Sequence, residues 1–222
     1  MPRVAPGLAD GLIYHIVNRG NGRQEVFHKD HDYLSFVELL KNALQRYPVR
    51  LYAYCLMPNH FHLLLVPEIA EDLSKFMQWF MTSHVRRYHG HYKTSGHIWQ
   101  GRFKSFIVQA DRHLLTVVRY IEGNPVRAGL SASAAHWKWS SHSERIFGTP
   151  EIISNLPIVL PDEWTTFVDT PLIDSELEKL RKSINRQAPY GAEQWQIQIS
   201  KELGLDSTMN LRGRPKKTLP EK

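Results

Sequence analysis

The sequence predicts an α+β protein in which helices pack on an antiparallel sheet, and three observations lead to this class. Four short runs have the apolar, β-branched and aromatic character of strands. Two longer segments between them repeat apolar residues every three or four positions, as amphipathic helices do. The chain has 222 residues, 42% hydrophobic and 23% charged, so we expect a globular domain with a sizeable core.

The first strand and helix lie near the N-terminus. The alternating run "LIYHIV", residues 12–17, is expected to be a strand, and a Gly-rich basic loop follows it. Asp30 or Asp32 can cap a helix over about residues 31–47, which Pro48 ends. The apolar positions that recur at helical spacing in this helix are Leu34, Val37, Leu40 and Leu44.

A β-hairpin and a long helix are expected next. Residues 49–57 and 60–67 both have strand character, and Pro58 with Asn59 between them predicts a tight turn. A helix over about residues 72–89 follows. Its inward-facing side chains are expected to be Leu73, Phe76, Met77 and Phe80.

One more strand and one more helix complete the pattern. The run "RFKSFIVQA", residues 102–110, is expected to be a strand, and Asp111 opens a helix that Gly123 and Pro125 close. The order β-α-β-β-α-β-α is typical of ferredoxin-like folds, and we expect the helices on one face of the sheet. Because glycine lacks a Cβ, Gly123 is expected to loosen the last turn.

The chain is expected to contain one main domain and a small appendage. We place the main domain at residues 1–146, a proline-punctuated connecting region at 147–185, and a small helical element with a basic tail at 186–222. In the tail motif "RGRPKK", Arg212 and Arg214 can lie extended in an A·T-rich minor groove. A disordered solubilising tail explains the same residues equally well.

Composition limits the compartment and the class of partner. Cys55 is the single cysteine, which excludes an intrachain disulfide and fits a reducing compartment. The apolar runs are too short to span a bilayer, and we see no secretory signal, so we expect a cytoplasmic protein without a membrane segment. The net charge of +6 favours a polyanionic partner but does not choose between DNA, RNA and a membrane surface.

A pair of histidines opens the third expected strand. His60 and His62 are two residues apart, so they point to the same side of the strand as Leu64 and Val66. The residues that point to the opposite side are Phe61, Leu63 and Leu65. Two neighbouring imidazoles at the start of a buried strand can hold a metal ion. Two histidines that hydrogen bonds satisfy at the end of a sheet are the alternative.

The helix after residue 111 carries a tyrosine beside its core stripe. The expected core stripe consists of Leu114, Val118 and Ile121. Tyr120, His113 and Asn124 share a neighbouring stripe, because positions four and seven apart lie on one side of a helix. A phenol at the edge of a core can reach a groove, and Asn124 offers an amide oxygen one turn later. Amphipathic packing of the tyrosine and capping by the asparagine are the alternative.

Residues 73–110 contain no Asp or Glu, although they carry many basic and aromatic residues. Cations that follow phosphates and rings that stack on bases suit single-stranded nucleic acid, whereas a solvated basic helix with core aromatics is the alternative. Arg19 and Arg23, in the Gly-rich loop, are candidate residues for contacts with phosphates or bases. They can equally be exposed residues of a surface loop that bind nothing. The other residues expected to contact nucleic acid are Arg86, Arg87, Trp99, Arg102, Lys104 and His113.

Three motifs follow one another along the chain: "PNHFH", "GRFKS" and "RYIEGNPVRAG". With flanking stretches such as "YHIVNRGNGRQEVF" and "WKWSS", they cover most of residues 12–142. On these motifs the chain resembles the single-tyrosine HUH transposases, and most closely the REP-associated tyrosine transposases of bacteria. The combination in this order is specific, whereas the histidine pair or the tyrosine helix alone is not.

The resemblance implies an HUH endonuclease fold that cleaves and rejoins single-stranded or hairpin DNA through a 5′-phosphotyrosine. It makes Tyr120 the nucleophile, His60 and His62 ligands of a divalent metal (Mg²⁺ or Mn²⁺), and Asn124 the third ligand. Rejoining uses the bond energy kept in the phosphotyrosine, so no nucleotide cofactor is expected, and the sequence has no G-x-x-x-x-G-K-[ST] run. A DNA partner places the protein at the nucleoid within the cytoplasm.

Other interpretations stay open on the sequence alone. Tyr88 and Tyr92, in basic surroundings, are alternative nucleophiles. The runner-up function is a non-catalytic DNA-binding protein that keeps the fold, although the intact His60, His62 and Tyr120 argue against it. A replication-initiator or relaxase type of HUH nuclease usually carries another metal-ligand arrangement and often a second tyrosine. The sequence does not fix the target repeat, the cleavage site or the oligomeric state, monomer or homodimer.

Overall fold

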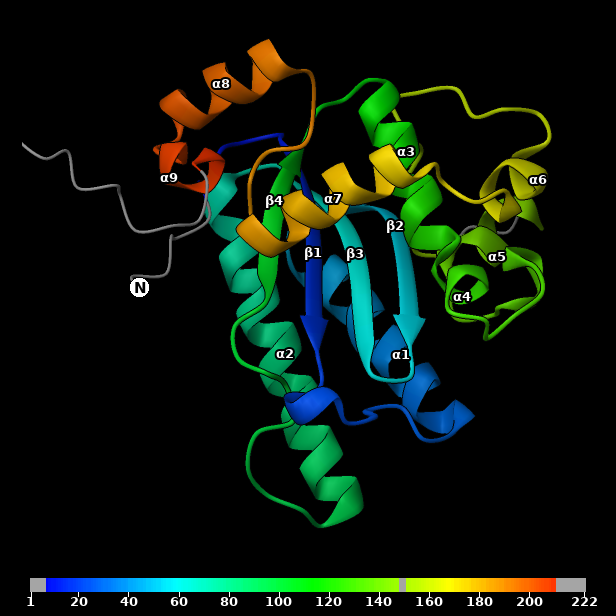
Figure 1. Cartoon of the computed structure of the whole chain (residues 1–222). Coiled ribbons are helices and arrows are strands. Elements are labelled where there is room, and N and C mark those ends of the chain that lie inside the picture. Colours follow the sequence, from blue (N-terminus) through cyan, green and yellow to red (C-terminus); the bar gives the residue numbers. More distant parts are fainter. Residues whose placement is uncertain (1–6, 148–150, 211–222) are drawn as a thin grey trace, which may run out of the picture.

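The structure of the chain, a computed structural model, describes residues 7–147 and 151–210. Its centre is a four-stranded antiparallel sheet in the order β2-β3-β1-β4 (Figure 1). The strands are β1 (Ile13–Arg19), β2 (Val49–Met57), β3 (His60–Pro67) and β4 (Lys104–Val108). The predicted hairpin is present, because β2 and β3 pair directly across the turn at Pro58 and Asn59.

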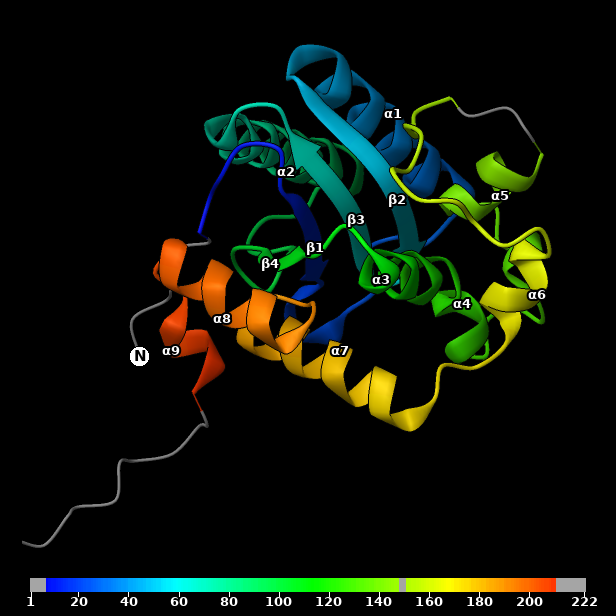
Figure 2. The same cartoon turned by 90° about the horizontal axis from the view of Figure 1, so that it is seen from above.

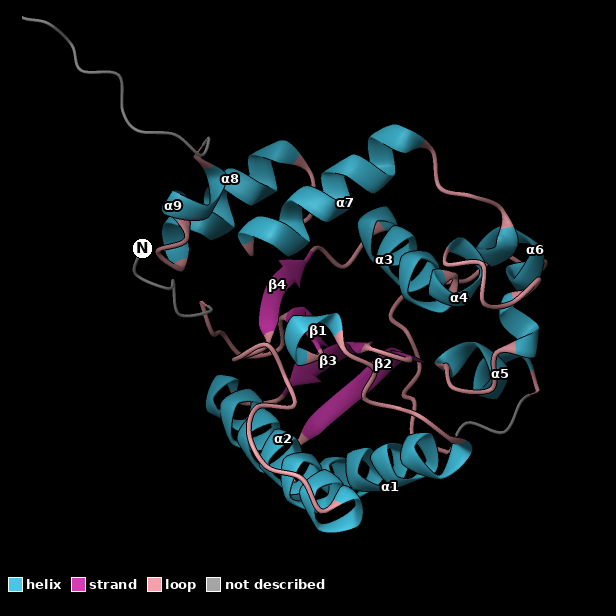
Figure 3. Cartoon of the chain, turned by 60° about the horizontal axis from the view of Figure 1, so that its bottom comes forward, coloured by secondary structure: helices cyan, strands magenta, loops and turns pink. Residues whose placement is uncertain are grey.

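Helices cover both faces of this sheet. α1 (Asp30–Arg46) and α2 (Ala70–Tyr92) lie on one face, and α3 (Arg112–Glu122) and α7 (Asp174–Arg186) lie on the other (Figures 2 and 3). The predicted α+β class and element order are confirmed, whereas the expectation that the helices share one face is wrong. The reason is visible in β3, where every residue after His60 is buried, so both sides of the strand need a cover.

The layer between the sheet, α1 and α2 is a large aromatic core. Phe36 lies at its centre, with its ring centroid 5.2 Å from that of Phe61 and 4.7 Å from that of Phe80. The four side chains of α2 that we expected to face inward are all buried. In α1, Leu34 is 56% exposed although it belongs to the apolar series that recurs at helical spacing. The larger side chains of Tyr33 and Phe36 take the core-facing positions, so the buried stripe is shifted by one residue.

The apolar stripe of α3 packs on the second face of the sheet. Leu114, Val118 and Ile121 are fully buried there, as predicted. Asp111 caps the helix, since its Oδ1 accepts a hydrogen bond from the backbone N–H of His113 at 2.8 Å. These contacts fix the start and the rotation of the helix that carries Tyr120.

The break after α3 has a packing cause. The helix ends at Glu122, and the short helix α4 (Asn124–Arg127) begins directly after Gly123. A Cβ on Gly123 would lie 3.0 Å from the carbonyl oxygen of Val168 in α6 (Trp164–Asp169). The glycine therefore permits a close backbone approach, a role that the predicted loosening of the last turn did not include.

The end of α3 is anchored by a fully buried carboxylate. Glu122 accepts hydrogen bonds from Ser141 Oγ at 2.6 Å, Trp164 Nε1 at 2.8 Å, His142 Nδ1 at 3.1 Å and Arg145 Nε at 3.1 Å, partners that come from α5 (Ser141–Ile146) and α6. Burial alone raises the pKa of Glu122, but the hydrogen bonds and the Arg145 charge outweigh it and hold that pKa below its usual value. The network ties three helices together beside the tyrosine.

Short elements complete the described chain: η1 (Asn21–Arg23), η2 (Ala134–His136), α8 (Glu193–Glu202) and α9 (Asp206–Met209). Tyr190 pairs with the edge strand β4, since its N–H donates to the Ile107 carbonyl at 2.8 Å and its carbonyl accepts from the Gln109 N–H at 2.9 Å. This pairing occupies part of the outer edge of β4. The division of the chain at residues 146 and 185 stays a prediction. None of the described helices is both long and apolar enough to cross a membrane.

Candidate active site

The histidine pair lies at the start of β3, on the face of the sheet that α3 covers. His60 is half-buried and His62 is only 3% exposed. Their ring centroids are 5.1 Å apart and their planes nearly perpendicular. Across the sheet, His60 lies opposite Arg19 and His62 lies opposite Val17 of β1. The strand pairing thus brings the positively charged Arg19 beside the histidine pair.

Each imidazole of the pair has its Nδ1 engaged. Nδ1 of His60 lies 2.7 Å from Oδ1 of Asn59, and Nδ1 of His62 lies 2.8 Å from Nε2 of His15. The Asn59 oxygen can only accept, so it places the His60 proton on Nδ1 and leaves a lone pair on Nε2. In both rings, Nε2 is therefore the nitrogen that remains for a ligand.

The pair is neutral at neutral pH. Burial, followed by the charges of Arg19 and Arg127, lowers the pKa of His60 to about 4. The pKa of His62 is also well below its usual value. Burial is the main cause, and the neighbouring histidines and arginines lower this pKa further. Neutral imidazoles keep the lone pair that a metal ion needs.

Tyr120 stands over this pair from α3. Its ring meets the His62 ring edge-on, with centroids 5.7 Å apart, and it lies 6.2 Å from the His15 ring. The residue is 7% exposed. Within residues 7–147 and 151–210, no group forms a hydrogen bond with the Tyr120 hydroxyl. The hydroxyl oxygen is also not one of the fully buried polar atoms that lack a partner, so it is not sealed from solvent. The hydroxyl is therefore open to solvent and to a substrate.

Arg127 joins Tyr120 to Asn124. The guanidinium carbon lies 4.1 Å from the centroid of the Tyr120 ring. One guanidinium nitrogen donates to Oδ1 of Asn124 at 2.6 Å, and another donates to the Tyr120 carbonyl at 3.3 Å. Asn124 is 4% exposed, and its Nδ2 is buried without a partner in the described structure. The Asn124 oxygen that we expected to bind metal is thus already held by a cation.

A metal at this place would have to be held by two imidazoles and an amide. The described residues contain no group of three or more His, Cys, Asp and Glu side chains that could hold a metal ion. The donors fit a divalent cation nonetheless, because His60 Nε2 carries a lone pair, the hydrogen bond of His62 is made by its Nδ1 and not by its Nε2, and the Asn124 oxygen has a second lone pair beside the one that Arg127 uses.

The sequence of the chain matches a known family of transposases. The family model described as "Transposase IS200 like" matches residues 9–124, which is more than half of the chain and includes the histidine pair, Tyr120 and Asn124. The chain belongs to the IS200-like transposase family. A REP-associated tyrosine transposase of Haemophilus influenzae is 30% identical over 122 residues, which cover 50% of this chain and 69% of the relative. The predicted kinship with REP-associated tyrosine transposases is confirmed.

One solved structure agrees with the fold of this transposase. A structure of a REP-associated tyrosine transposase bound to a REP hairpin matches with a TM-score of 0.56 and 18% identity, over 78% of this chain and 100% of that one. A transposase from Deinococcus radiodurans matches with a TM-score of 0.39 and 22% identity, over 55% of this chain and 96% of that one. The first likeness supports the fold alone, and the second is too weak to support an argument.

The residues predicted to contact nucleic acid are scattered over the molecule. Arg19 is exposed beside His60, and Arg23 is exposed in η1. Arg102 and Lys104 are exposed just before and at the start of β4. Arg86 and Arg87 are exposed on α2, in the layer on the other face of the sheet. Arg212 and Arg214 lie outside the described residues.

Two of these predicted residues have other roles in the structure. Trp99 is 5% exposed, packs 5.1 Å from the Phe61 ring and directs its indole N–H toward His84 Nδ1 at 3.3 Å. The expectation that its ring stacks on bases is wrong, because the ring fills the aromatic core. His113 lies at the opposite end of α3 from Tyr120, with its Nδ1 2.7 Å from Asp111 Oδ1.

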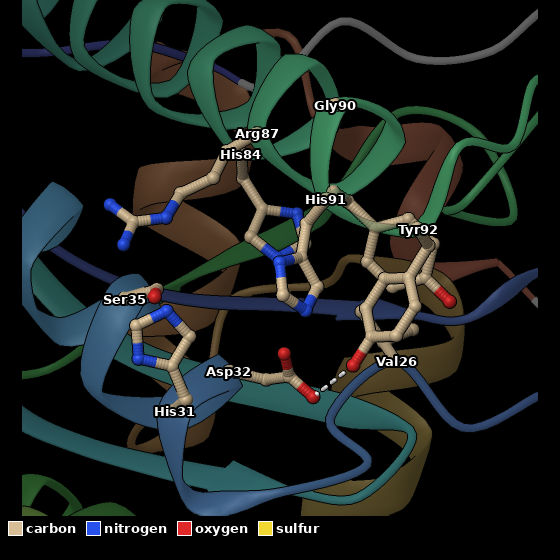
Figure 4. A pocket seen from close by; sticks show the side chains of 10 residues that line it. Val26, His31, Asp32, Ser35, His84, Arg87, Gly90, His91 and Tyr92 are labelled. Carbon is tan, nitrogen blue, oxygen red and sulfur yellow. Dashed lines mark hydrogen bonds between the residues drawn. The ribbon is translucent and has the colours of Figure 1, made fainter.

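A cavity of about 340 Å³ lies between α1 and the end of α2 (Figure 4). The alternative nucleophiles Tyr88 and Tyr92 line it, together with His31, Asp32 and His91. The Tyr92 hydroxyl donates to Asp32 at 2.7 Å, and burial with this bond raises the pKa of Tyr92. The cavity belongs to the α1 and α2 layer, so the structure brings Tyr120, and not these two tyrosines, to the histidine pair.

Sequence reasoning missed two residues of the site, His15 and Arg127. Arg127 is three residues after Asn124 and seven after Tyr120, a helical spacing that could have revealed it. His15 could not be placed, because its contact with His62 depends on the register between β1 and β3.

Proposed function

We propose that the chain is a metal-dependent endonuclease and strand-transferase for single-stranded DNA, acting on hairpin-forming repeats through a 5′-phosphotyrosine. The observation that carries the proposal is the Tyr120 ring packed edge-on against His62, with an open hydroxyl and a neutral imidazole pair beneath it. The family match supports the class of reaction, since its members are transposases.

The proposed reaction needs no external energy. The Tyr120 oxygen attacks the scissile phosphorus as its proton passes to solvent, and the bond from phosphorus to the 3′-oxygen breaks. The 3′-oxygen leaves as a hydroxyl after it takes up a proton, and the 5′-phosphate stays on the tyrosine. Attack by a 3′-hydroxyl on the phosphotyrosine then releases Tyr120 and rejoins a strand.

The residues of the chain have separate tasks in this scheme. His60 and His62, with Asn124, would hold a divalent cation, for which the family resemblance implies Mg²⁺ or Mn²⁺. Such a cation would polarise the scissile phosphate when bound. Arg127 orients the Tyr120 ring and the Asn124 amide, and Arg19 adds positive charge beside His60, where a phosphate would lie. Burial of the histidines keeps both imidazoles uncharged, which favours metal binding over protonation.

Hairpin DNA is the proposed partner. The support is the solved structure named above, whose protein is bound to a REP hairpin, together with the net charge of +6 in this chain. We expect a monomer or a homodimer, which sedimentation with and without the hairpin would distinguish. We also expect the chain to work in the cytoplasm at the nucleoid, where its substrate would be found.

A covalent-adduct assay tests the function. A labelled hairpin oligonucleotide with a single-stranded flank is incubated with the chain and Mn²⁺, and products are separated in a denaturing gel. We expect a protein-bound band that the Tyr120→Phe variant lacks, while Tyr88→Phe and Tyr92→Phe retain it. Hairpin binding without any adduct, whichever divalent metal is supplied, would instead support the non-catalytic DNA-binding protein.

A further inference from the structure

His15 is a fully buried histidine in the middle of the sheet with one nitrogen that has no partner. Its Nε2 lies 2.8 Å from Nδ1 of His62, the ring centroids are 5.0 Å apart, and the ring planes are inclined by only 22°. Its Nδ1 is buried and unpaired in the described chain. Such an orphan costs about 1–3 kcal/mol, and an apolar residue would fill the same space without it. The fold alone therefore gives no reason for an imidazole here.

The contact between the two rings allows two proton arrangements. A neutral imidazole carries one N–H and one lone pair. In the first arrangement, His62 Nδ1–H donates to His15 Nε2, and His62 Nε2 keeps a lone pair toward the groove. In the second, His15 Nε2–H donates to His62 Nδ1, and the proton of His62 sits on Nε2, where it blocks a ligand. Only the first arrangement makes His62 a ligand.

His60 provides a comparison within the same pair. Its Nδ1 faces the Asn59 oxygen, whose orientation is fixed because Nδ2 of Asn59 donates to the Arg23 carbonyl at 3.2 Å. That oxygen cannot donate, so His60 has one arrangement only. His15 holds the corresponding position for His62, from the neighbouring strand instead of from the neighbouring residue.

We propose that His15 is a positioning residue of the site, which holds the His62 ring and accepts its Nδ1 proton so that Nε2 of His62 is free to bind a metal ion. Partners of this kind fix the ring orientation and the proton position of metal-binding histidines, and their loss typically lowers metal affinity by about 10–100-fold. The inference rests on the proposed metal-dependent function, because it assigns His62 as a ligand.

Two amide substitutions separate this role from simple packing. In His15→Gln, the side-chain oxygen can occupy the position of Nε2 and still accept from His62. In His15→Asn, the amide reaches only the position of Nδ1 and loses that contact. Both variants are polar, uncharged and smaller than histidine, so each controls for the other. Unfolding temperatures and circular dichroism establish that both are folded.

The test is calorimetric titration of the DNA-free chain with Mn²⁺ alone and with Co²⁺ alone. We expect affinity in His15→Gln within about threefold of the parent, a loss of about 10–100-fold in His15→Asn, and the largest loss in His62→Ala. Parent-like binding in His15→Asn, with binding lost in His62→Ala, would overturn the role of His15 and leave the proposed function standing. Parent-like binding in both His60→Ala and His62→Ala would overturn the metal site itself.

A second measurement uses the unsubstituted chain and covers the case in which His15→Asn does not fold. Nitrogen-15 NMR of the imidazoles in the Zn²⁺-loaded chain reports which ring nitrogen carries the proton. We expect the His62 proton on Nδ1 and the His15 proton on its own Nδ1. A proton on Nε2 of His15 in the loaded chain would contradict the proposal.

Discussion

The guanidinium of Arg127 lies 4.1 Å from the centre of the Tyr120 ring and donates a hydrogen bond to Asn124. One cation thus touches both the proposed nucleophile and the proposed third ligand. Because α4 restarts the helix right after Gly123, Asn124 and Arg127 lie one turn apart and can make this contact.

Replacement of Arg127 is expected to slow adduct formation. The Arg127→Gln variant loses a charge-assisted bond and the cation over the Tyr120 ring, which corresponds to about a 10–100-fold lower single-turnover rate at saturating DNA. Arg112→Gln, an exposed change at the far end of α3, is the matched control and should leave the rate unchanged. A parent-like rate in Arg127→Gln would remove this residue from the proposed mechanism.

Arg19 and Arg86 are expected to affect different steps. Arg19 lies opposite His60, so Arg19→Gln should lower the rate of adduct formation even when the hairpin is saturating. Arg86 is on the opposite layer, so Arg86→Gln can change hairpin affinity and its salt dependence but not that rate. Single-turnover assays across protein concentrations separate the two effects, and equal rates for the Arg19 variant and the parent would count against a phosphate at this position.

Glu122 is expected to matter for stability more than for chemistry. Glu122→Gln removes a buried charge that Arg145 and His142 face, which should lower the free energy of unfolding by about 3 kcal/mol in urea titrations. Glu178→Gln, on the exposed side of α7, is the control for loss of a carboxylate and should have little effect. An unchanged urea midpoint in Glu122→Gln would mean that the network does not hold α3.

The free energy of unfolding should fall as the pH is lowered from 7 to 5. Burial lowers the pKa of His15 to about 3. Burial is also the main reason why the pKa of His60 and the pKa of His84 are each lowered to about 4. Each folded-state pKa lies below the unfolded value of about 6.5, so the unfolded chain binds protons that the folded chain excludes. The free energy of unfolding then drops as the pH falls through this window, by up to about 1.4 kcal/mol per pH unit for each histidine.

The His84→Asn variant tests this pH dependence away from the site. Asparagine keeps an acceptor near Nδ1 for the Trp99 indole but does not titrate. The dependence of the free energy of unfolding on pH should become less steep by the contribution of one histidine. The control substitution His97→Asn, at an exposed position, should leave this dependence unchanged. Identical slopes in the parent and in His84→Asn would contradict the assignment.

Local sequence signals predicted most elements because the strands alternate and α2 and α3 carry apolar stripes at helical spacing. The hairpin that presents His60 and His62 was predictable for the same reason, and the tyrosine helix from its Asp111 cap. The face that each helix covers was not predictable, since strands that bury both sides leave no polar face as a marker.

Long-range contacts explain the remaining errors. Whether an aromatic such as Trp99 stacks on bases or fills a core depends on α1 and α2 meeting over it, which sequence spacing does not encode. His15 contacts His62 only because of the register between β1 and β3. Gly123 has no room for a Cβ partly because the backbone of α6 packs against it. These features come from tertiary packing between segments that are distant along the chain.

The most direct test of the central claim is mass spectrometry of the peptide that carries the DNA after adduct formation with Mn²⁺ and complete nuclease digestion. We expect a single modified peptide, with a nucleotide 5′-phosphate esterified to Tyr120, and none from chain in which His60 and His62 are both alanine. Attachment at Tyr88 or Tyr92, or undiminished attachment in the double-alanine chain, would contradict the account.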